Sequence, residues 1–294
     1  KIILFLKDKL LTILVTGAKG QLGRELKVLD PKFPYCQFLF ADKDELDITD
    51  EASIAKYFAG HSIEYLINCA AYTAVDKAEE EKKKAFLING EAVGLLAYFC
   101  EKNNVQLIHI STDYVFDGTS KKPYTEKDST CPINVYGASK LRGEEMAMKQ
   151  SPSSIIIRTS WLYSSFENNF VNTMKRLMQQ KESINIVNDQ WGCPTNAADL
   201  ALAIMRIIKS GKSRENPGIF NYANSEAANW YQFAVAIKEL TNSSCIINPI
   251  TSIEYPTAAR RPAFSILDTA KILATYENIS IRNWKDGLRS CLAR

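Results

Sequence analysis

The stretch LTILVTGAKGQLG at residues 11–23 decides the fold. A short apolar run leads into a turn in which Gly17, Gly20 and Gly23 follow the spacing G-x-x-G-x-x-G, and a helical pattern begins at Gln21. In such a turn the first glycine permits the tight bend, the second lets backbone amides approach a pyrophosphate, and the third allows the helix to pack closely on the strand. The helix N-terminus adds free N–H groups and a dipole that favours anions. We therefore expect a dinucleotide-binding loop here.

Beyond this loop, short apolar runs alternate with helical patterns. The runs expected as strands are 11–16, 37–41, 65–69, 105–111 and 154–158, and helical spacing marks 21–29, 53–59, 77–102 and 135–149. Near-continuous apolar runs are typical of strands that helices cover on both faces of a parallel sheet. The alternation predicts right-handed βαβ units, and hence an α/β fold with a doubly wound parallel sheet of the Rossmann type.

After about residue 158 the alternation loosens. Helices are expected at 169–180 and 196–209 and a strand at 184–187, and the segments 218–222, 230–240 and 245–250 follow at wider spacing. We predict a dinucleotide-binding Rossmann domain at residues 10–158 and a smaller C-terminal α/β region at residues 159–294 that mainly binds substrate. Part of this region should return to the Rossmann sheet. Residues 1–9 lack the cleavage site of a signal peptide and are left out of this interpretation.

Size and composition exclude several classes of protein. A chain of 294 residues with 46% hydrophobic and 23% charged residues is of ordinary globular composition, which excludes disorder as its main state. The net charge of +3 is too weak to indicate nucleic-acid binding, and no apolar run approaches the roughly 20 residues that cross a bilayer. The seven cysteines form no CxxC pair, and neither of the two histidines lies near a cysteine pair. We expect reduced, mostly buried thiols, no structural zinc and a cytoplasmic location.

Tyr136 and Lys140 are candidates for acid–base chemistry. Their i, i+4 spacing places them on one helix face. A free tyrosine pKa of about 10 is too high for proton exchange at neutral pH, and a nearby ammonium is expected to lower it. A second Y-x-x-x-K, Tyr98 and Lys102, has no catalytic neighbours and is interpreted as structural. Tyr136 differs because Thr112, at the carboxyl end of a predicted strand, can offer its hydroxyl to the same substrate oxygen or to the phenol.

Two acidic positions are candidates for dinucleotide contacts. Asp42, at the end of the second predicted strand, is placed to bond a ribose 2′-hydroxyl, which favours NAD. Lys19 and Lys43 lie close enough in sequence to offset its charge, so the choice between NADH and NADPH stays open. The pair Asp47-Ile48 is a candidate for contact with the adenine, and capping of the following helix is a compatible alternative.

These motifs together resemble the extended short-chain dehydrogenase/reductases and, in closer detail, the dTDP-4-dehydrorhamnose reductase family. The resemblance is carried by 17–23, NCAA at 68–71, AYTAVDKAE at 71–79, STDYVFDG at 111–118, RTSW at 158–161, NDQWGCPT at 188–195 and the segment 255–262. It covers about residues 12 to 292. It implies reduction by NADPH, or NADH, of the 4-keto group of a dTDP-linked 6-deoxy sugar, which gives dTDP-L-rhamnose.

The resemblance also implies roles for individual residues. Tyr136 is the expected proton donor, assisted by Lys140 and Thr112. The residues expected to line the dinucleotide are Gly17, Gly20, Gln21, Leu22, Gly23, Asp42, Asp47, Ile48, Ala71, Tyr72, Thr73, Ile110, Tyr136 and Lys140. Those expected to meet the substrate are Thr112, Asp113, Trp161 and Arg261. Trp161 has a core position as its alternative. Arg261, whose guanidinium can bind a diphosphate through two nitrogens, has a salt bridge as its alternative.

Some members of the family are dimers bridged by Mg²⁺ through glutamates, which makes a homodimer and a bound Mg²⁺ candidates here. Glu25 fits one of these positions, but Ala198 stands where another carboxylate is expected. This departure counts against a metal, and no metal ligand is predicted.

Three alternatives remain beside the reductase. A 4,6-dehydratase needs a glutamate after the aspartate, where this chain has Asp113-Tyr114, so dehydration is disfavoured. A reductase or 4-epimerase acting on another nucleotide-linked keto-sugar is compatible with the motifs. A non-catalytic, NADP-binding regulatory subunit, like the β subunit of methionine adenosyltransferase, is disfavoured because Thr112, Tyr136 and Lys140 are retained. A hydrolase is excluded because His109 lies inside a strand, where a core histidine is expected.

Overall fold

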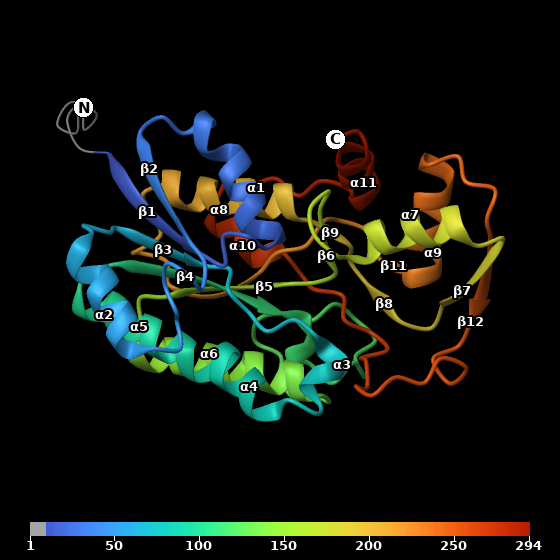
Figure 1. The fold of residues 1–294 in the computed structure, drawn as a ribbon, viewed down its shortest axis with the longest axis horizontal. Coiled ribbons are helices and arrows are strands. Elements are labelled where there is room, and N and C mark those ends of the chain that lie inside the picture. The colour runs from blue at the N-terminus through green and yellow to red at the C-terminus, as the bar shows by residue number, and fades with distance from the viewer. Residues whose placement is uncertain (1–9) are drawn as a thin grey trace.

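A six-stranded parallel sheet forms the centre of the computed structural model, which describes residues 10–294 (Figure 1). Its strands are β1 (Leu11–Thr16), β2 (Cys36–Ala41), β3 (Tyr65–Asn68), β4 (Gln106–Thr112), β5 (Ile155–Thr159) and β10 (Gly218–Asn221). They lie in the order β10-β5-β4-β3-β1-β2, and every pairing is parallel. The predicted doubly wound sheet is confirmed. The prediction about residues 1–9 lies outside the described residues.

Helices cover both faces of this sheet (Figure 1). One face carries α1 (Gln21–Leu29), α8 (Ala197–Lys209) and α10 (Ala270–Thr275), and the other carries α2 (Glu51–Gly60), α5 (Ala92–Lys102) and α6 (Val135–Gln150). Successive β1 side chains divide between the layers: Ile13 and Val15 pack with α1 and α8, and Leu14 packs with α2 and α5. Because helices cover both faces, the strands are largely apolar, as their sequences indicated.

The strand order reverses at β1, which has β2 on one side and β3 on the other. Thr16 and Asn68, the last residues of β1 and β3, are register partners at this point. Ligands of open α/β sheets bind outside the carboxyl ends of the strands, next to such a reversal. The topology therefore places the candidate site above Thr16 and Asn68.

The segment 77–102 differs from the single helix that was predicted. It contains α3 (Val75–Ala78), a turn, α4 (Lys82–Phe86), the π-helix η2 (Leu87–Glu91) and then α5. Asn89 in η2 accepts a hydrogen bond from Tyr72 N at 2.8 Å and donates to Tyr72 O at 3.0 Å and Ser139 Oγ at 2.9 Å. These bonds join segments far apart in the chain, so helical periodicity gives no sign of the interruption.

The second half builds a smaller unit with a core of its own. Its helices are α7 (Phe170–Gln180), α9 (Trp230–Leu240) and α11 (Trp284–Leu292), and its strand pairs are β6 (Leu162–Tyr163) with β9 (Thr195–Asn196), β7 (Ser183–Val187) with β12 (Ile246–Ile250), and β8 (Trp191–Gly192) with β11 (Ala228–Asn229). Tyr163, Phe233 and Trp284 are central to this core. Short 3-10 turns lie at η1 (Asp30–Lys32) and η3 (Asp113–Val115). Across residues 10–294, no helix is long and apolar enough to cross a membrane.

Candidate active site

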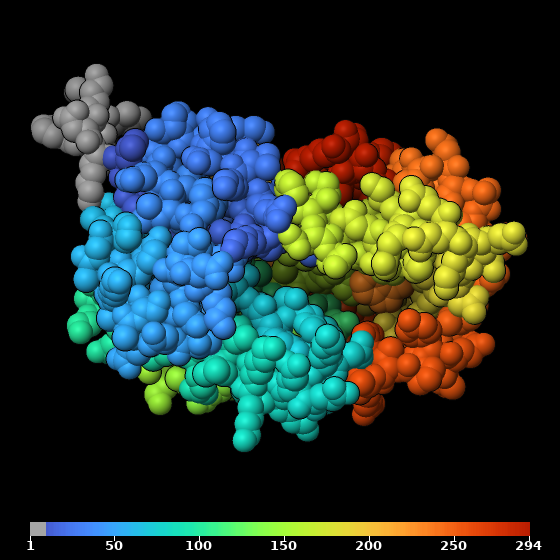
Figure 2. Space-filling view, in the orientation of Figure 1, coloured from blue at the N-terminus to red at the C-terminus, as the bar shows by residue number. Residues whose placement is uncertain are grey.

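A cleft of about 960 Å³ lies along the carboxyl ends of the sheet strands, where Figure 2 shows the surface hollowed between the blue N-terminal part and the yellow segment. Most of the residues proposed from sequence line it: Gly17, Gly20, Gln21, Leu22, Asp42, Asp47, Ile48, Ala71, Thr73, Ile110, Thr112, Asp113, Tyr136, Lys140, Trp161 and Arg261. Gly23 and Tyr72 are not part of the lining. Tyr72 instead directs its hydroxyl to Glu81, at 3.1 Å.

The glycine-rich turn has the geometry of a phosphate-binding loop. Gly17 has φ +65°, and a Cβ there would lie 2.6 Å from Ala70 N. A Cβ on Gly23 would lie 2.5 Å from Gly17 O, so this glycine serves the packing of α1 beneath the loop. Helix α1 starts after Gly20, and no side chain of the described residues caps it. Its first amides therefore face the cleft without a competing side-chain acceptor, which suits a pyrophosphate.

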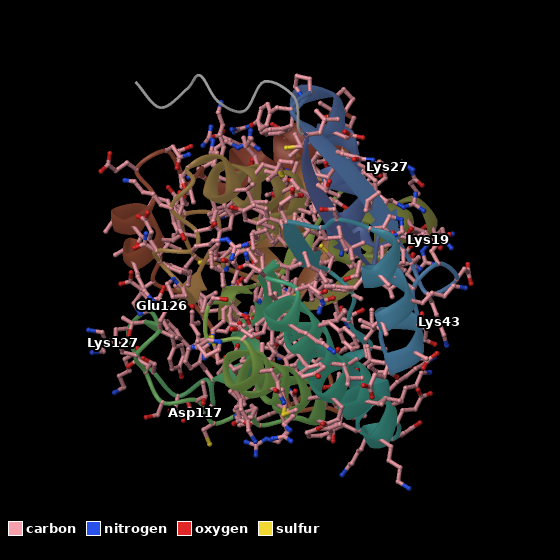
Figure 3. The ribbon with its side chains drawn as sticks, turned by 90° about the vertical axis from the view of Figure 1, so that its left-hand side faces the viewer. Lys19, Lys27, Lys43, Asp117, Glu126 and Lys127 are labelled. Carbon is pink, nitrogen blue, oxygen red and sulfur yellow. The ribbon has the colours of Figure 1, made fainter. Side chains whose placement is uncertain are left out.

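The carboxylate of Asp42 is held by backbone amides at the edge of the cleft. Its Oδ2 accepts from Lys19 N and its Oδ1 from Lys43 N, both at 2.9 Å. The Lys19 and Lys43 side chains lie on the same edge of the molecule (Figure 3), and Lys43 is 81% exposed. Further along, hydrogen bonds from the Thr49 hydroxyl and amide lower the pKa of Asp47. The Lys19 ammonium pairs with Asp44 at 3.0 Å, and that of Lys43 lies 3.8 Å from Asp47, at the same edge as the acid expected to meet the ribose.

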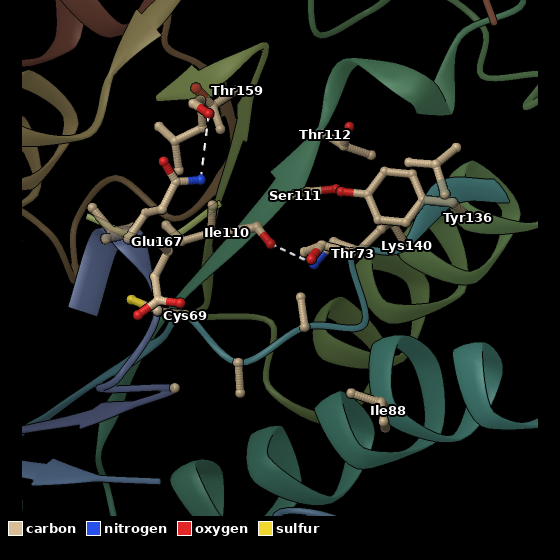
Figure 4. A pocket seen from close by; sticks show the side chains of 18 of the residues that line it. Cys69, Thr73, Ile88, Ile110, Ser111, Thr112, Tyr136, Lys140, Thr159 and Glu167 are labelled. Atoms are coloured by element: carbon tan, nitrogen blue, oxygen red, sulfur yellow. Dashed lines mark hydrogen bonds between the residues drawn. The ribbon is translucent and has the colours of Figure 1, made fainter. Parts of the chain in front are cut away.

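Tyr136 is positioned by the start of α6. The side chain of Asn134 caps this helix by accepting from Gly137 N at 2.7 Å, and its Nδ2 donates to Arg260 O at 2.8 Å. Gly137 has no room for a Cβ, which would overlap Tyr114 O. The helix therefore lies directly against the η3 turn, and the Tyr114 and Tyr136 rings meet edge to face at 5.8 Å. This contact sets the Tyr136 ring beside the strand end that carries Thr112 (Figure 4).

The expected lowering of the Tyr136 pKa is wrong for this structure. Burial raises the pKa of Tyr136 to about 12, and a hydrogen bond from Thr112 only partly opposes the shift. The Lys140 Nζ donates to Ile110 O at 2.6 Å (Figure 4), and burial lowers the pKa of this lysine to about 8. A phenol that keeps its proton at neutral pH can donate it to a developing alkoxide. The geometry thus suits reduction of a carbonyl.

Asp113 is a buried carboxyl group at the floor of the cleft, only 2% exposed. Its Oδ1 accepts from Thr112 Oγ1 at 3.1 Å, whereas its Oδ2 has no hydrogen-bond partner among the described residues. Burial raises the pKa of Asp113 to about 7. The carboxyl group of Asp113 therefore holds its proton to a higher pH in the folded protein than in the unfolded chain.

Asp113→Asn should stabilise the ligand-free protein at pH 8 and change it little at pH 4. The pKa of Asp113 is about 7 in the folded protein and about 3.9 in the unfolded chain. Between pH 4 and pH 7 the folded protein therefore binds one more proton than the unfolded chain, and its free energy of unfolding falls as the pH rises through this range. A gap of about three units corresponds to a gain of up to about 4 kcal/mol for the neutral amide at alkaline pH. Urea denaturation at both pH values measures this difference, and equal gains at both would contradict it.

Trp161 and Arg261 each combine a structural contact with a place in the cleft wall. Trp161 has φ +47°, and its ring stacks on that of Trp230 with centroids 3.5 Å apart. Arg261 makes a two-point salt bridge with Asp76, with nitrogen–oxygen distances of 3.1 and 2.6 Å. The alternative of a salt bridge for Arg261 is thus confirmed, and its role as a diphosphate ligand stays a prediction.

The sequence interpretation missed the polar loop SSFENN at residues 164–169. Gln21 Oε1 accepts from Ser164 Oγ at 3.1 Å and from Asn169 Nδ2 at 3.0 Å, so this loop is bonded to the start of α1. Asn169 also lines the cleft. The run of polar residues before a helix was the only signal in the sequence, and such runs are common in loops of every kind.

The structure places Glu25 in an ion pair and leaves the cysteines without disulfide bonds. Glu25 is buried, and its carboxylate accepts from Arg294 Nη1 at 2.6 Å. Within residues 10–294, no three side chains of the metal-ligating types gather closely enough to hold a metal ion. All seven cysteines are free thiols, and most are buried.

Comparison with known proteins identifies relatives along the whole described chain. The family model of the RmlD substrate binding domain matches residues 11–294. A dTDP-4-dehydrorhamnose reductase from Sinorhizobium fredii is 39% identical over 282 residues, which cover 94% of each chain. The crystal structure of a dTDP-4-dehydrorhamnose reductase from Clostridium acetobutylicum superposes with a TM-score of 0.91 at 38% identity, covering 96% of this chain and 99% of that one. One from Bacillus anthracis, in complex with NADP, has a TM-score of 0.91 at 35% identity, with coverages of 97% and 99%.

Proposed function

The chain belongs to the RmlD substrate binding domain family, and we propose that it reduces the 4-keto group of dTDP-4-dehydro-L-rhamnose to give dTDP-L-rhamnose. The hydride donor is a nicotinamide dinucleotide. One observation carries this proposal: a single cleft brings the phosphate loop at Gly17 together with Thr112, Tyr136 and Lys140 and with the aromatic wall at Trp161. A dinucleotide and a sugar nucleotide can therefore meet beside one proton donor.

The residues of this cleft account for the proton that reduction requires. When bound, the reduced nicotinamide supplies a hydride to C4 of the sugar. The Tyr136 phenol donates its proton to the oxygen that would otherwise become an alkoxide, so the carbonyl gains one hydride and one proton. The Thr112 hydroxyl, at the end of β4 beside the ring, is placed to orient the phenol (Figure 4). Lys140, one helical turn away with a pKa of about 8, is the acid that we propose restores the proton of the phenol, whose pKa is about 12, and it becomes an amine in doing so.

The preferred dinucleotide is proposed to be NADPH. Both oxygens of Asp42 already accept backbone amides, and the exposed ammonium groups of Lys19 and Lys43 stand on the same edge (Figure 3). A 2′-phosphate on the ribose would compete with Asp44 and Asp47 for these two ammonium groups, and their attraction would offset its repulsion by the Asp42 carboxylate.

Lys43→Ala should raise the KM for NADPH about fivefold and leave that for NADH nearly unchanged. The fivefold figure corresponds to about 1 kcal/mol, the upper range for an exposed ion pair. Lys127→Ala removes an exposed lysine on the opposite edge of the molecule (Figure 3) and is the matched control. Equal losses with both dinucleotides would indicate that Lys43 does not meet the 2′-phosphate.

The function is tested by mixing the protein with dTDP-4-dehydro-L-rhamnose and following the absorbance of NADPH or NADH. Substrate-dependent loss of this absorbance is the expected result. No loss in folded protein that still binds a dinucleotide would reject this substrate and favour another keto-sugar or a regulatory subunit. A dinucleotide that stays bound through purification and turnover would indicate an epimerase.

A further inference from the structure

A buried row of side chains runs from the phosphate loop to Lys140. Thr16 Oγ1 donates to Asn68 Oδ1 at 2.7 Å, and Asn68 Nδ2 lies 3.0 Å from His109 Nδ1. The other imidazole nitrogen, Nε2, lies 3.3 Å from Lys140 Nζ. Asn68 and His109 are both 0% exposed, and Thr16 is 1% exposed. Because solvent does not reach these groups, the neighbouring side chains decide which imidazole nitrogen carries the proton.

The backbone fixes the direction of hydrogen bonding in this row. Asn68 Oδ1 also accepts from Ala70 N at 3.2 Å, and an N–H group can only donate, so the amide oxygen must stay on that side. Asn68 therefore presents its NH₂ group to His109 Nδ1, which must be the acceptor. Burial and the nearby Lys140 hold the pKa of His109 well below its usual range, so the ring is neutral. A neutral ring that accepts at Nδ1 carries its proton on Nε2.

That Nε2 proton faces Lys140 Nζ, which is a hydrogen-bond acceptor only as a neutral amine. Nζ also donates to Ile110 O at 2.6 Å, a bond that both forms of the lysine can make. An ammonium facing the Nε2–H would place two donors against each other. The hydrogen-bond geometry at His109 therefore favours the amine.

The other titratable groups near Lys140 do not reverse this preference. The Cys69 thiol is neutral because burial raises its pKa to about 12. Glu144, on the next turn of α6, favours the ammonium, but its oxygens already accept from Arg158 at 3.0 and 2.7 Å. The Tyr136 phenol is neutral as well.

We propose that His109 is a positioning residue that donates its Nε2 proton to the amine form of Lys140, with Thr16 and Asn68 fixing the direction of the bond. The inference rests on the proposed reductase, in which the Lys140 ammonium returns one proton to the Tyr136 phenolate and is left as the amine. His109 stabilises that amine, so it makes Lys140 a stronger acid toward the phenolate. Neither the Y-x-x-x-K spacing nor the Thr112 hydroxyl provides this effect.

The tautomer can be read directly, because the chain has only two histidines. In ¹H–¹⁵N spectra of the imidazoles, His109 should carry its proton on Nε2 and should not titrate between about pH 6 and pH 9. His61 is the other imidazole, exposed and with its Nδ1 2.9 Å from Tyr57 O, so the variant His61→Gln assigns the signals. A His109 protonated on Nδ1, or charged, would overturn the proposal. This readout needs no substrate, so it is independent of whether the reductase activity is found.

Asn68→Asp tests the consequence for Lys140. A carboxylate at this position accepts from Nδ1–H, which leaves Nε2 as an acceptor for the ammonium. The basic limb of the kcat profile, which is the fall of kcat at high pH and reports deprotonation of Lys140, should then move to higher pH by about one unit. The value of kcat near neutrality should fall by up to about tenfold, the factor that one pKa unit corresponds to. His61→Gln should leave the profile unchanged.

A second variant keeps the test decisive if Asn68→Asp fails to fold or stays protonated. His109→Gln removes the Nε2 donor without adding charge and offers the ammonium an amide oxygen as acceptor, so the basic limb should move in the same direction, with the KM for the sugar nucleotide within about twofold of the original. A purely structural role for His109 would lower the melting temperature and leave the limb in place. A folded variant with an unshifted basic limb would therefore refute the proposal.

Discussion

Tyr136→Phe should lower kcat about 10² to 10⁴-fold, the usual range for a lost general acid. The phenol is the protonated group beside Thr112 in the cleft, and burial keeps its pKa at about 12, so at neutral pH the enzyme always holds the proton it must donate. Phenylalanine keeps the edge contact with the Tyr114 ring but cannot supply the proton. The KM for NADPH should change little. Steady-state kinetics at saturating NADPH measures the effect.

The chain offers a matched control in its second Y-x-x-x-K. Tyr98 is 43% exposed on α5, and Lys102 Nζ lies 5.9 Å from the centre of its ring. Tyr98→Phe removes the same hydroxyl from the same spacing outside the cleft, and kcat should stay within about twofold of the original, since exposed substitutions usually cost little. Full activity in Tyr136→Phe, or an equal loss in both variants, would reject Tyr136 as the proton donor.

Glu144→Gln should destabilise the protein by about 3 to 5 kcal/mol, the range for breaking a buried ion pair. The Glu144 and Arg158 side chains are each only 3% exposed, and the carboxylate accepts from Arg158 Nε at 3.0 Å, from Arg158 Nη2 at 2.7 Å and from the Ser111 hydroxyl. The amide removes the negative charge and leaves the guanidinium buried without a counter-ion. Urea denaturation, read by circular dichroism, measures the loss.

Two further variants separate the effect of burial from that of charge. Asp286→Asn breaks the ion pair between Asp286 and Arg289, whose side chains are 55% and 61% exposed, respectively. This variant should lower the free energy of unfolding by less than about 1 kcal/mol. Glu144→Gln combined with Arg158→Met removes both charges and should recover part of the loss, because the buried guanidinium is gone. A loss from Glu144→Gln as small as that from Asp286→Asn would show that the pair does not stabilise the fold as argued.

The sequence alone predicted the elements and the centre of the site. Apolar runs that repeat between helical patterns require a sheet buried on both faces, and the observed strands β1 to β5 lie within a residue or so of their predicted bounds. The phosphate loop was predicted from the spacing of Gly17, Gly20 and Gly23, and the positive φ of Gly17 and its contact with Ala70 explain why no side chain fits at the first of them. Tyr136 and Lys140 were found because i, i+4 spacing and strand ends are local features. Periodicity and backbone steric limits depend on residues that are neighbours in the chain, so the sequence is enough to predict them.

The tertiary structure alone decided the protonation of the site and its supporting contacts. Burial raises the pKa of Tyr136, where the spacing to Lys140 had suggested the opposite, because desolvation depends on everything packed around the ring. The π-helix at Asn89 and the loop bonded to Gln21 depend on partners far away in the chain. His109, expected only to fill the core, meets Lys140 because β4 and α6 pack together. Charge, solvent exclusion and hydrogen-bond direction are set by neighbours in space, which one sequence does not specify.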